Sequence, residues 1–139
     1  ASGVRVIDDS YNANPVSFGN ALIAFRSLSG TGKKIVVFAD MLELGAEEER
    51  FHSELGEEIA VSGVDVALAY GKRSRASIKT LQRSATDCVA QHFEGGLEVL
   101  AALKEVLRPG DLVLFKGSRS MHVEKVLDGI RNISFSSQT

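Results

Sequence analysis

The chain has 139 residues, of which 44% are hydrophobic and 24% charged, and its formal net charge at pH 7 is −2. This length and composition suit one globular domain with one core. The charge balance offers no basic surface for nucleic acid, and 6% aromatic residues are too few for a base-stacking platform. No apolar run approaches the roughly 20 residues of a membrane span. The single cysteine, Cys88, excludes an intrachain disulfide and a cysteine-based metal cluster.

The first half of the chain alternates between predicted strands and predicted helices. The run VRVI predicts a strand at residues 4–7. After it, Phe18 and Leu22 recur at helical spacing, and Ser17 is the expected N-cap of that helix. The segment KIVVFA at 34–39, continuously apolar after Lys34, predicts a strand that is covered on both faces of a sheet.

The second half continues this alternation. A helix containing Leu55 and Ile59 is expected to end at Gly63. The elements expected after it are a strand at 64–70, a helix after Gly71, a strand at 87–93, a helix around Leu103, a strand at 111–116 and a helix around Val126. Strands separated by helices require crossover connections. The predicted fold class is therefore α/β, a Rossmann-like open, mostly parallel sheet of five or six strands with helices on both faces. We expect residues 1–139 to form one domain with a tail that frays from about residue 131.

Three loops rich in polar residues follow the first, second and fifth predicted strands. They carry the sequences DDSYNANP (8–15), DMLELG (40–45) and KGSRSMH (116–122). Ligands on open parallel sheets bind beyond the carboxyl ends of the strands. We therefore expect one shared binding site, built from these loops at one edge of the sheet.

The loop at 8–15 has two interpretations that the sequence leaves open. Its acids and asparagines could serve only a turn and a helix cap. Tyr11 beside Asn12 and Asn14 instead favours a nucleoside. The ring would stack on a base, the amides would bind its edge, and a carboxylate such as Asp9 would bind ribose hydroxyls.

The other two loops also carry chemistry with a structural alternative. Asp40 and Glu43 could bind a cation or an ammonium group, or Asp40 could cap a turn. Ser118 and the free amides of the following helix could receive an anion, and Arg119 could hold a carboxylate with two parallel hydrogen bonds. His52 is interpreted as a structural histidine. No nucleophile–base pair or metal-ligand spacing is present, so we assign no catalytic residue and no metal ligand.

The segments DDSYNANP, VVFADMLELG and LVLFKGSRSMHVEKV together resemble the C-terminal domain of Mur ligases, over about residues 4–130. The pattern YNANP is similar to the branch of that family that adds D-alanyl-D-alanine to UDP-N-acetylmuramoyl-tripeptide. Sister ligases carry histidine in this loop. The resemblance implies a cytoplasmic bacterial enzyme of peptidoglycan synthesis that makes an amide bond with ATP and Mg²⁺ through an acyl phosphate.

The resemblance also implies roles for individual residues. The residues that match the loop reaching toward adenine and ribose are Asp9, Tyr11, Asn12 and Asn14. The residues that match segments associated with the incoming dipeptide are Asp40, Ser118 and Arg119. In this family a central domain holds most of ATP and Mg²⁺, and an N-terminal domain holds the UDP sugar. We therefore expect the 139 residues to be a fragment of a three-domain enzyme that folds alone without catalysing the reaction.

Two alternative functions remain open from the sequence. One is another Mur ligase or a folylpolyglutamate-type ligase, which YNANP disfavours. The other is a free-standing nucleotide-binding or regulatory module without catalysis. A phosphate loop of the form G-x-x-x-x-G-K-[ST], encoded in frame upstream of Ala1, would favour the ligase, and a natural start codon there would favour the module.

Overall fold

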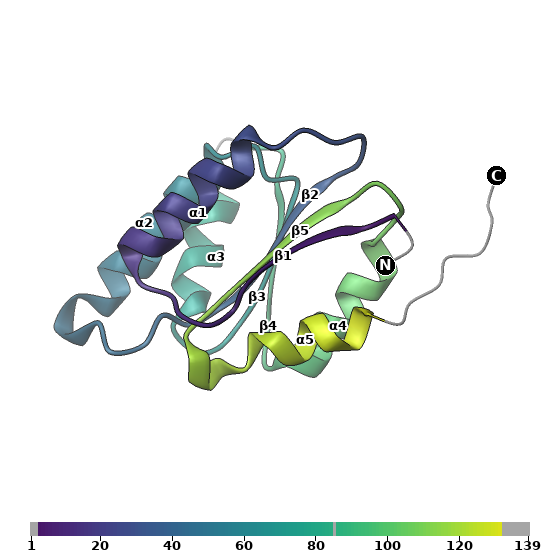
Figure 1. Cartoon of the computed structure of the whole chain (residues 1–139). Coiled ribbons are helices and arrows are strands. Elements are labelled where there is room, and N and C mark those ends of the chain that lie inside the picture. The colour runs from purple at the N-terminus through teal and green to yellow at the C-terminus, as the bar shows by residue number, and fades with distance from the viewer. Residues whose placement is uncertain (1–2, 85, 132–139) are drawn as a thin grey trace.

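An open sheet of five strands lies between two layers of helices in the computed structural model, which describes residues 3–84 and 86–131 (Figure 1). The strands are β1 (Arg5–Asp9), β2 (Lys34–Ala39), β3 (Val66–Tyr70), β4 (Val89–Phe93) and β5 (Leu112–Lys116). Their order across the sheet is β1-β5-β2-β3-β4, and all four neighbouring pairs are parallel. The predicted α/β class is confirmed, with five strands and no antiparallel pair among the described residues.

Helices cover both faces of the sheet, as predicted. The helices on one face are α1 (Pro15–Ser27), α2 (Glu48–Ala60) and α3 (Ser74–Arg83). Those on the other face are α4 (Gly96–Val106) and α5 (Val123–Ile130). Two short 3₁₀ turns, η1 (Gly45–Glu47) and η2 (Arg119–Met121), lie in the loops that lead into α2 and α5. None of the helices in the described part of the chain is long and apolar enough to cross a membrane.

The central strand β2 shows why an uninterrupted apolar run was the strongest strand signal. Val36 and Phe38 pack into the core beneath α1, α2 and α3, whereas Ile35 and Val37 pack against α4 and α5. All four side chains are fully buried. Phe38 also meets Phe18 of α1 edge to face, with ring centroids 5.6 Å apart. A strand covered on both faces needs apolar residues at its buried positions, here 35–39, and the prediction of a strand at 34–39 is confirmed.

The start of α1 differs from the prediction. The helix begins at Pro15, and its N-cap is Asn14, which has extended backbone angles. The side-chain oxygen of Asn14 accepts a hydrogen bond from the Ser17 N–H at 2.9 Å, and Ser17 Oγ accepts one from the Asn14 N–H at 3.1 Å. Ser17 was therefore wrong as the N-cap, because Pro15 suits the first helical position and moves the helix start toward the N-terminus.

The carboxyl ends of the strands meet at one edge of the sheet. In the register, Lys116 at the end of β5 pairs with Asp9 on one side and with Phe38 on the other. Tyr70 at the end of β3 pairs with Ala39 and Phe93. The three polar loops that follow β1, β2 and β5 thus start from the same edge, as predicted. The frayed tail expected from about residue 131 falls mainly on 132–139, outside the described residues.

Candidate functional site

An open cleft of about 520 Å³ lies between the loops that follow β1, β2 and β5. It is lined by residues 12–14, 42–44, 118–120 and 122, and we call it the three-loop cleft. Two hydrogen bonds join the second and third of these loops. The Ser118 N–H donates to the Asp40 carbonyl at 3.2 Å, and the Leu42 N–H donates to Ser118 Oγ at 2.8 Å. The second and third loops are therefore joined to each other at the shared edge that the sequence predicts.

Tyr11 and Arg119, predicted for different ligands, contact one another. The guanidinium carbon of Arg119 lies 5.2 Å from the centroid of the Tyr11 ring, which is a cation–π geometry. The Tyr11 side chain is 71% exposed, so it does not contribute to the core. Arg119 and His122 line the three-loop cleft and also a neighbouring hollow of about 470 Å³, which Tyr11 borders.

The other residues predicted to bind the nucleotide use some of their polar atoms for bonds within the domain. The side-chain oxygen of Asn12 accepts from the next backbone N–H at 2.9 Å, and that of Asn14 caps α1. Asp9 Oδ2 lies 2.9 Å from Lys116 Nζ, and the Asp9 side chain stays 43% exposed. Lys116 had no partner that the sequence could name. The loop interpretation of these residues is thus visible in the structure, and nucleotide contact stays a prediction.

Asp40 is buried at 2% exposure, and its carboxylate caps the start of α3. Its Oδ1 accepts from the backbone N–H and the hydroxyl of Ser74, both at 2.8 Å, and its Oδ2 accepts from the Arg73 N–H at 3.0 Å. Gly71 leaves room for this arrangement, because a Cβ there would lie 2.3 Å from Asp40 Oδ1. Both oxygens are thus engaged within the domain, and the predicted dipeptide contact of Asp40 stays a prediction.

Two buried side chains form hydrogen bonds with the loops that line the cleft. His52 of α2 is fully buried, its Nε2 accepts from the Met41 N–H at 3.0 Å, and its Nδ1–H donates to the Glu48 carbonyl at 2.7 Å. The structural interpretation of His52 is confirmed, and these bonds specify its tautomer. At the end of β3, the Tyr70 hydroxyl donates to the Met121 carbonyl of η2. Burial, with smaller effects from Glu124 and Asp40, raises the pKa of Tyr70 to about 12, so this hydroxyl keeps its proton at neutral pH.

Backbone conformation also marks the cleft. Glu43 and His122 are the only residues other than glycine with positive φ in the described ranges 3–84 and 86–131, at 63° and 58°. Both line the three-loop cleft. Such angles are uncommon outside glycine and gather at functional sites. Histidine is enriched at positive φ and gave a weak signal at position 122, whereas the residue type of Glu43 gave none.

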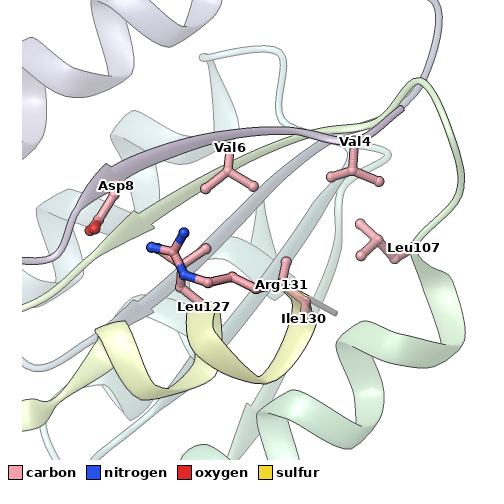
Figure 2. A pocket seen from close by; sticks show the side chains of 7 residues that line it. All are labelled: Val4, Val6, Asp8, Leu107, Leu127, Ile130 and Arg131. Atoms are coloured by element: carbon pink, nitrogen blue, oxygen red, sulfur yellow. The ribbon is translucent and has the colours of Figure 1, made fainter. Parts of the chain in front are cut away.

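A third hollow, of about 400 Å³, lies beside the edge strand β1 on the face that α4 and α5 cover (Figure 2). Its lining is mainly apolar, with Asp8 at one end and Arg131 reaching across from the end of α5. It contains none of the seven residues predicted for nucleotide or dipeptide. The three-loop cleft, which contains four of them, is therefore the candidate site.

Comparisons with known proteins identify the family of the chain. Residues 1–119 match the family model described as Mur ligase, glutamate ligase domain. The UDP-N-acetylmuramoyl-tripeptide–D-alanyl-D-alanine ligase of Bacillus subtilis is 39% identical over 126 residues, a match that covers 91% of this chain and 28% of that protein. The MurF ligase of Thermotoga maritima in complex with ADP superposes with a TM-score of 0.75 at 30% identity, over 91% of this chain and 28% of the other. A MurF crystal structure from Acinetobacter baumannii gives a TM-score of 0.81 at 29% identity, over 92% and 28%. The chain thus spans 28% of the length of each of these relatives. On the family match and on the fold, the chain belongs to the Mur ligase family.

Proposed function

We propose that the chain is the C-terminal domain of a longer, three-domain ligase that adds D-alanyl-D-alanine to UDP-N-acetylmuramoyl-tripeptide at the expense of ATP. The Bacillus subtilis relative is named for this activity, and the structure of the Thermotoga maritima relative is a complex with ADP. The observation that carries the proposal is the contact of Tyr11 with Arg119, 5.2 Å apart at the border of the cleft. It brings a group suited to a nucleobase beside a group suited to a carboxylate.

On the nucleotide side, the first loop offers an exposed ring and exposed polar groups. Tyr11 is 71% exposed and presents a flat surface on which adenine would stack. Asp9 is 43% exposed, so its carboxylate can accept from ribose hydroxyls while it also binds Lys116. Asn12 and Asn14 line the cleft beside them, where their amides would contact the nucleotide.

On the dipeptide side, the cleft offers charges of both signs. Arg119 would hold the dipeptide carboxylate with two parallel hydrogen bonds, next to Ser118 at the start of η2. The exposed side chain of Glu43 lines the same cleft and would receive the ammonium group. For Asp40 we propose a positioning role, because its carboxylate caps α3 while its carbonyl accepts from Ser118.

The proposed reaction forms the amide bond in two steps. The terminal carboxylate of the tripeptide takes the γ-phosphoryl group of ATP and becomes an acyl phosphate. The dipeptide amine, once deprotonated, attacks the acyl carbon, and inorganic phosphate leaves. The contribution of this domain would be to orient the reactants and to exclude water from the hydrolysis-prone acyl phosphate. No described residue is assigned a catalytic role.

The remaining ligand groups and partners would come from outside this chain. Among the described residues, no three His, Cys, Asp or Glu side chains lie close enough together to hold a metal ion. We propose that Mg²⁺ and most phosphate contacts belong to the central domain, and the UDP sugar to the N-terminal domain. A bacterial cytoplasmic location follows from the proposed use of ATP and a UDP-linked precursor.

The test uses the full-length protein that contains this chain, with ATP, UDP-N-acetylmuramoyl-tripeptide and a panel of acceptors, and it measures phosphate release. Release that requires D-alanyl-D-alanine is expected, and single amino acids are expected to be poor acceptors. Release that requires a single amino acid would instead indicate another ligase of the family. ADP binding without any ligation would support the regulatory module. The 139-residue chain alone is expected to release no phosphate.

A further inference from the structure

Lys116 is a buried cation at the carboxyl end of β5, and the proposed reaction gives it no role. Its side chain is 1% exposed, in the strand between β1 and β2. A buried ammonium is costly unless charged or polar partners surround it. The partners of Lys116 therefore show what this charge is used for.

Both polar partners of Lys116 belong to the loop predicted for the nucleotide. Its Nζ lies 2.9 Å from Asp9 Oδ2 and donates to the Asn12 carbonyl at 2.8 Å. The same nitrogen lies 6.0 Å from the centroid of the Phe18 ring in α1, the helix that this loop enters. One ammonium group thus binds the loop on both sides of Tyr11.

Tyr11 itself has no such support from the core. Its side chain is 71% exposed, and its ring contacts Arg119, with no other ring contact among the described residues. Besides this contact, the direction of the ring depends on the backbone of residues 9–12, which Lys116 anchors at Asp9 and Asn12. The ammonium also neutralises Asp9, so that the loop presents less negative charge to a polyanionic ligand.

We propose that Lys116 is a positioning residue for nucleotide recognition, which holds the Asp9–Asn12 segment so that Tyr11 faces the nucleotide. The inference rests on the proposed function, because it takes the ligand of this loop to be an adenine nucleotide. Lys116 touches no ligand in this proposal and acts only through Asp9 and Asn12.

The test variant is Lys116→Met in the full-length protein, which removes the charge and keeps an unbranched apolar chain. We expect ADP binding, measured by titration calorimetry, to weaken by about five-fold, which is the loss of about one stacking contact. The KM for ATP should rise by a similar factor while the KM for D-alanyl-D-alanine stays within about two-fold. Asp9 is 43% exposed, so this variant leaves no buried unpaired charge and should fold.

The matched control is Lys33→Met. Lys33 Nζ lies 2.9 Å from Asp111 Oδ2 at the opposite edge of the sheet, far along the strands from the three loops. The Lys33→Met variant should lower the stability of the protein without changing its affinity for ADP. Unchanged ADP affinity in Lys116→Met, or an equal rise of both KM values, would overturn the proposal, and so would equal weakening by Lys33→Met. If Lys116→Met does not fold, Lys116→Gln is judged by the same criteria. Failure of the wild-type protein to bind ADP would overturn the proposed function itself.

Discussion

Asp40→Ala should destabilise the domain strongly, because the carboxylate of Asp40 supplies the missing cap of α3. The change removes the acceptors of the Arg73 N–H, the Ser74 N–H and the Ser74 hydroxyl. Ser74 is fully buried, so water cannot replace the lost partners. A lost cap costs about 1 kcal/mol, and each buried donor left unpaired costs about 1–3 kcal/mol. We therefore expect the free energy of unfolding to fall by about 3 kcal/mol and the Tm by about 10 °C.

The assay is urea unfolding of the 139-residue chain, followed by circular dichroism. Asp128→Ala is the control, because Asp128 also pairs with an arginine but is 64% exposed. That variant should change the free energy of unfolding by less than about 0.5 kcal/mol. Asp40→Asn keeps one acceptor oxygen and should lose about half as much as Asp40→Ala. If Asp40→Ala unfolds at the same urea concentration as Asp128→Ala, the capping argument is wrong.

Three further predictions follow from buried groups. His52→Ala leaves the buried Met41 N–H without its acceptor and opens a cavity, so urea unfolding should show a loss of about 3 kcal/mol; an unchanged midpoint would contradict this. Gly117→Ala would place a Cβ 2.5 Å from Val123 Cγ2, so the free energy of unfolding should fall by about 1–3 kcal/mol. A variant as stable as the wild type would show that α5 can shift to relieve this clash. Burial, with a smaller effect from Asp65, raises the pKa of Cys88 to about 11 from 9.0, so the thiolate fraction at pH 8 falls. The folded protein should react with a disulfide reagent at pH 8 about 10-fold more slowly than the chain in guanidinium, because the higher nucleophilicity of the less acidic thiolate offsets part of the fall in thiolate fraction. Equal reaction rates of the folded and unfolded chains would contradict the raised pKa of Cys88.

The strands and the shared edge were predictable because they depend on patterns that lie along the chain. Residues 35–39 are apolar without interruption, and a run this short and rich in β-branched residues favours a strand buried on both faces. The edge followed from topology alone, since strands joined through helices are parallel and end together. From the sequence alone, Tyr11, Asp40 and Arg119 are therefore expected at one end of the sheet.

The partners of individual side chains were not predictable, because they are far away in sequence. Lys116 and Asp9 are separated by most of the chain and meet only because β1 and β5 are neighbours. An aspartate at position 40 could bind a ligand or cap α3, and the residue type does not distinguish the two. In the structure Ser74 lies within reach of the Asp40 carboxylate, so the carboxylate caps α3. The error at Ser17 was local, since both Asn14 and Ser17 are good caps and Pro15 selects between them.

The central claim is that one edge of this domain contacts both the nucleotide and the dipeptide. It is tested most directly by steady-state kinetics of Tyr11→Ala and Arg119→Ala in the full-length protein. We expect Tyr11→Ala to raise the KM for ATP by about 5–10-fold, and Arg119→Ala to raise the KM for D-alanyl-D-alanine by about 10–100-fold. An unchanged KM for D-alanyl-D-alanine in Arg119→Ala, with phosphate release intact, would contradict it.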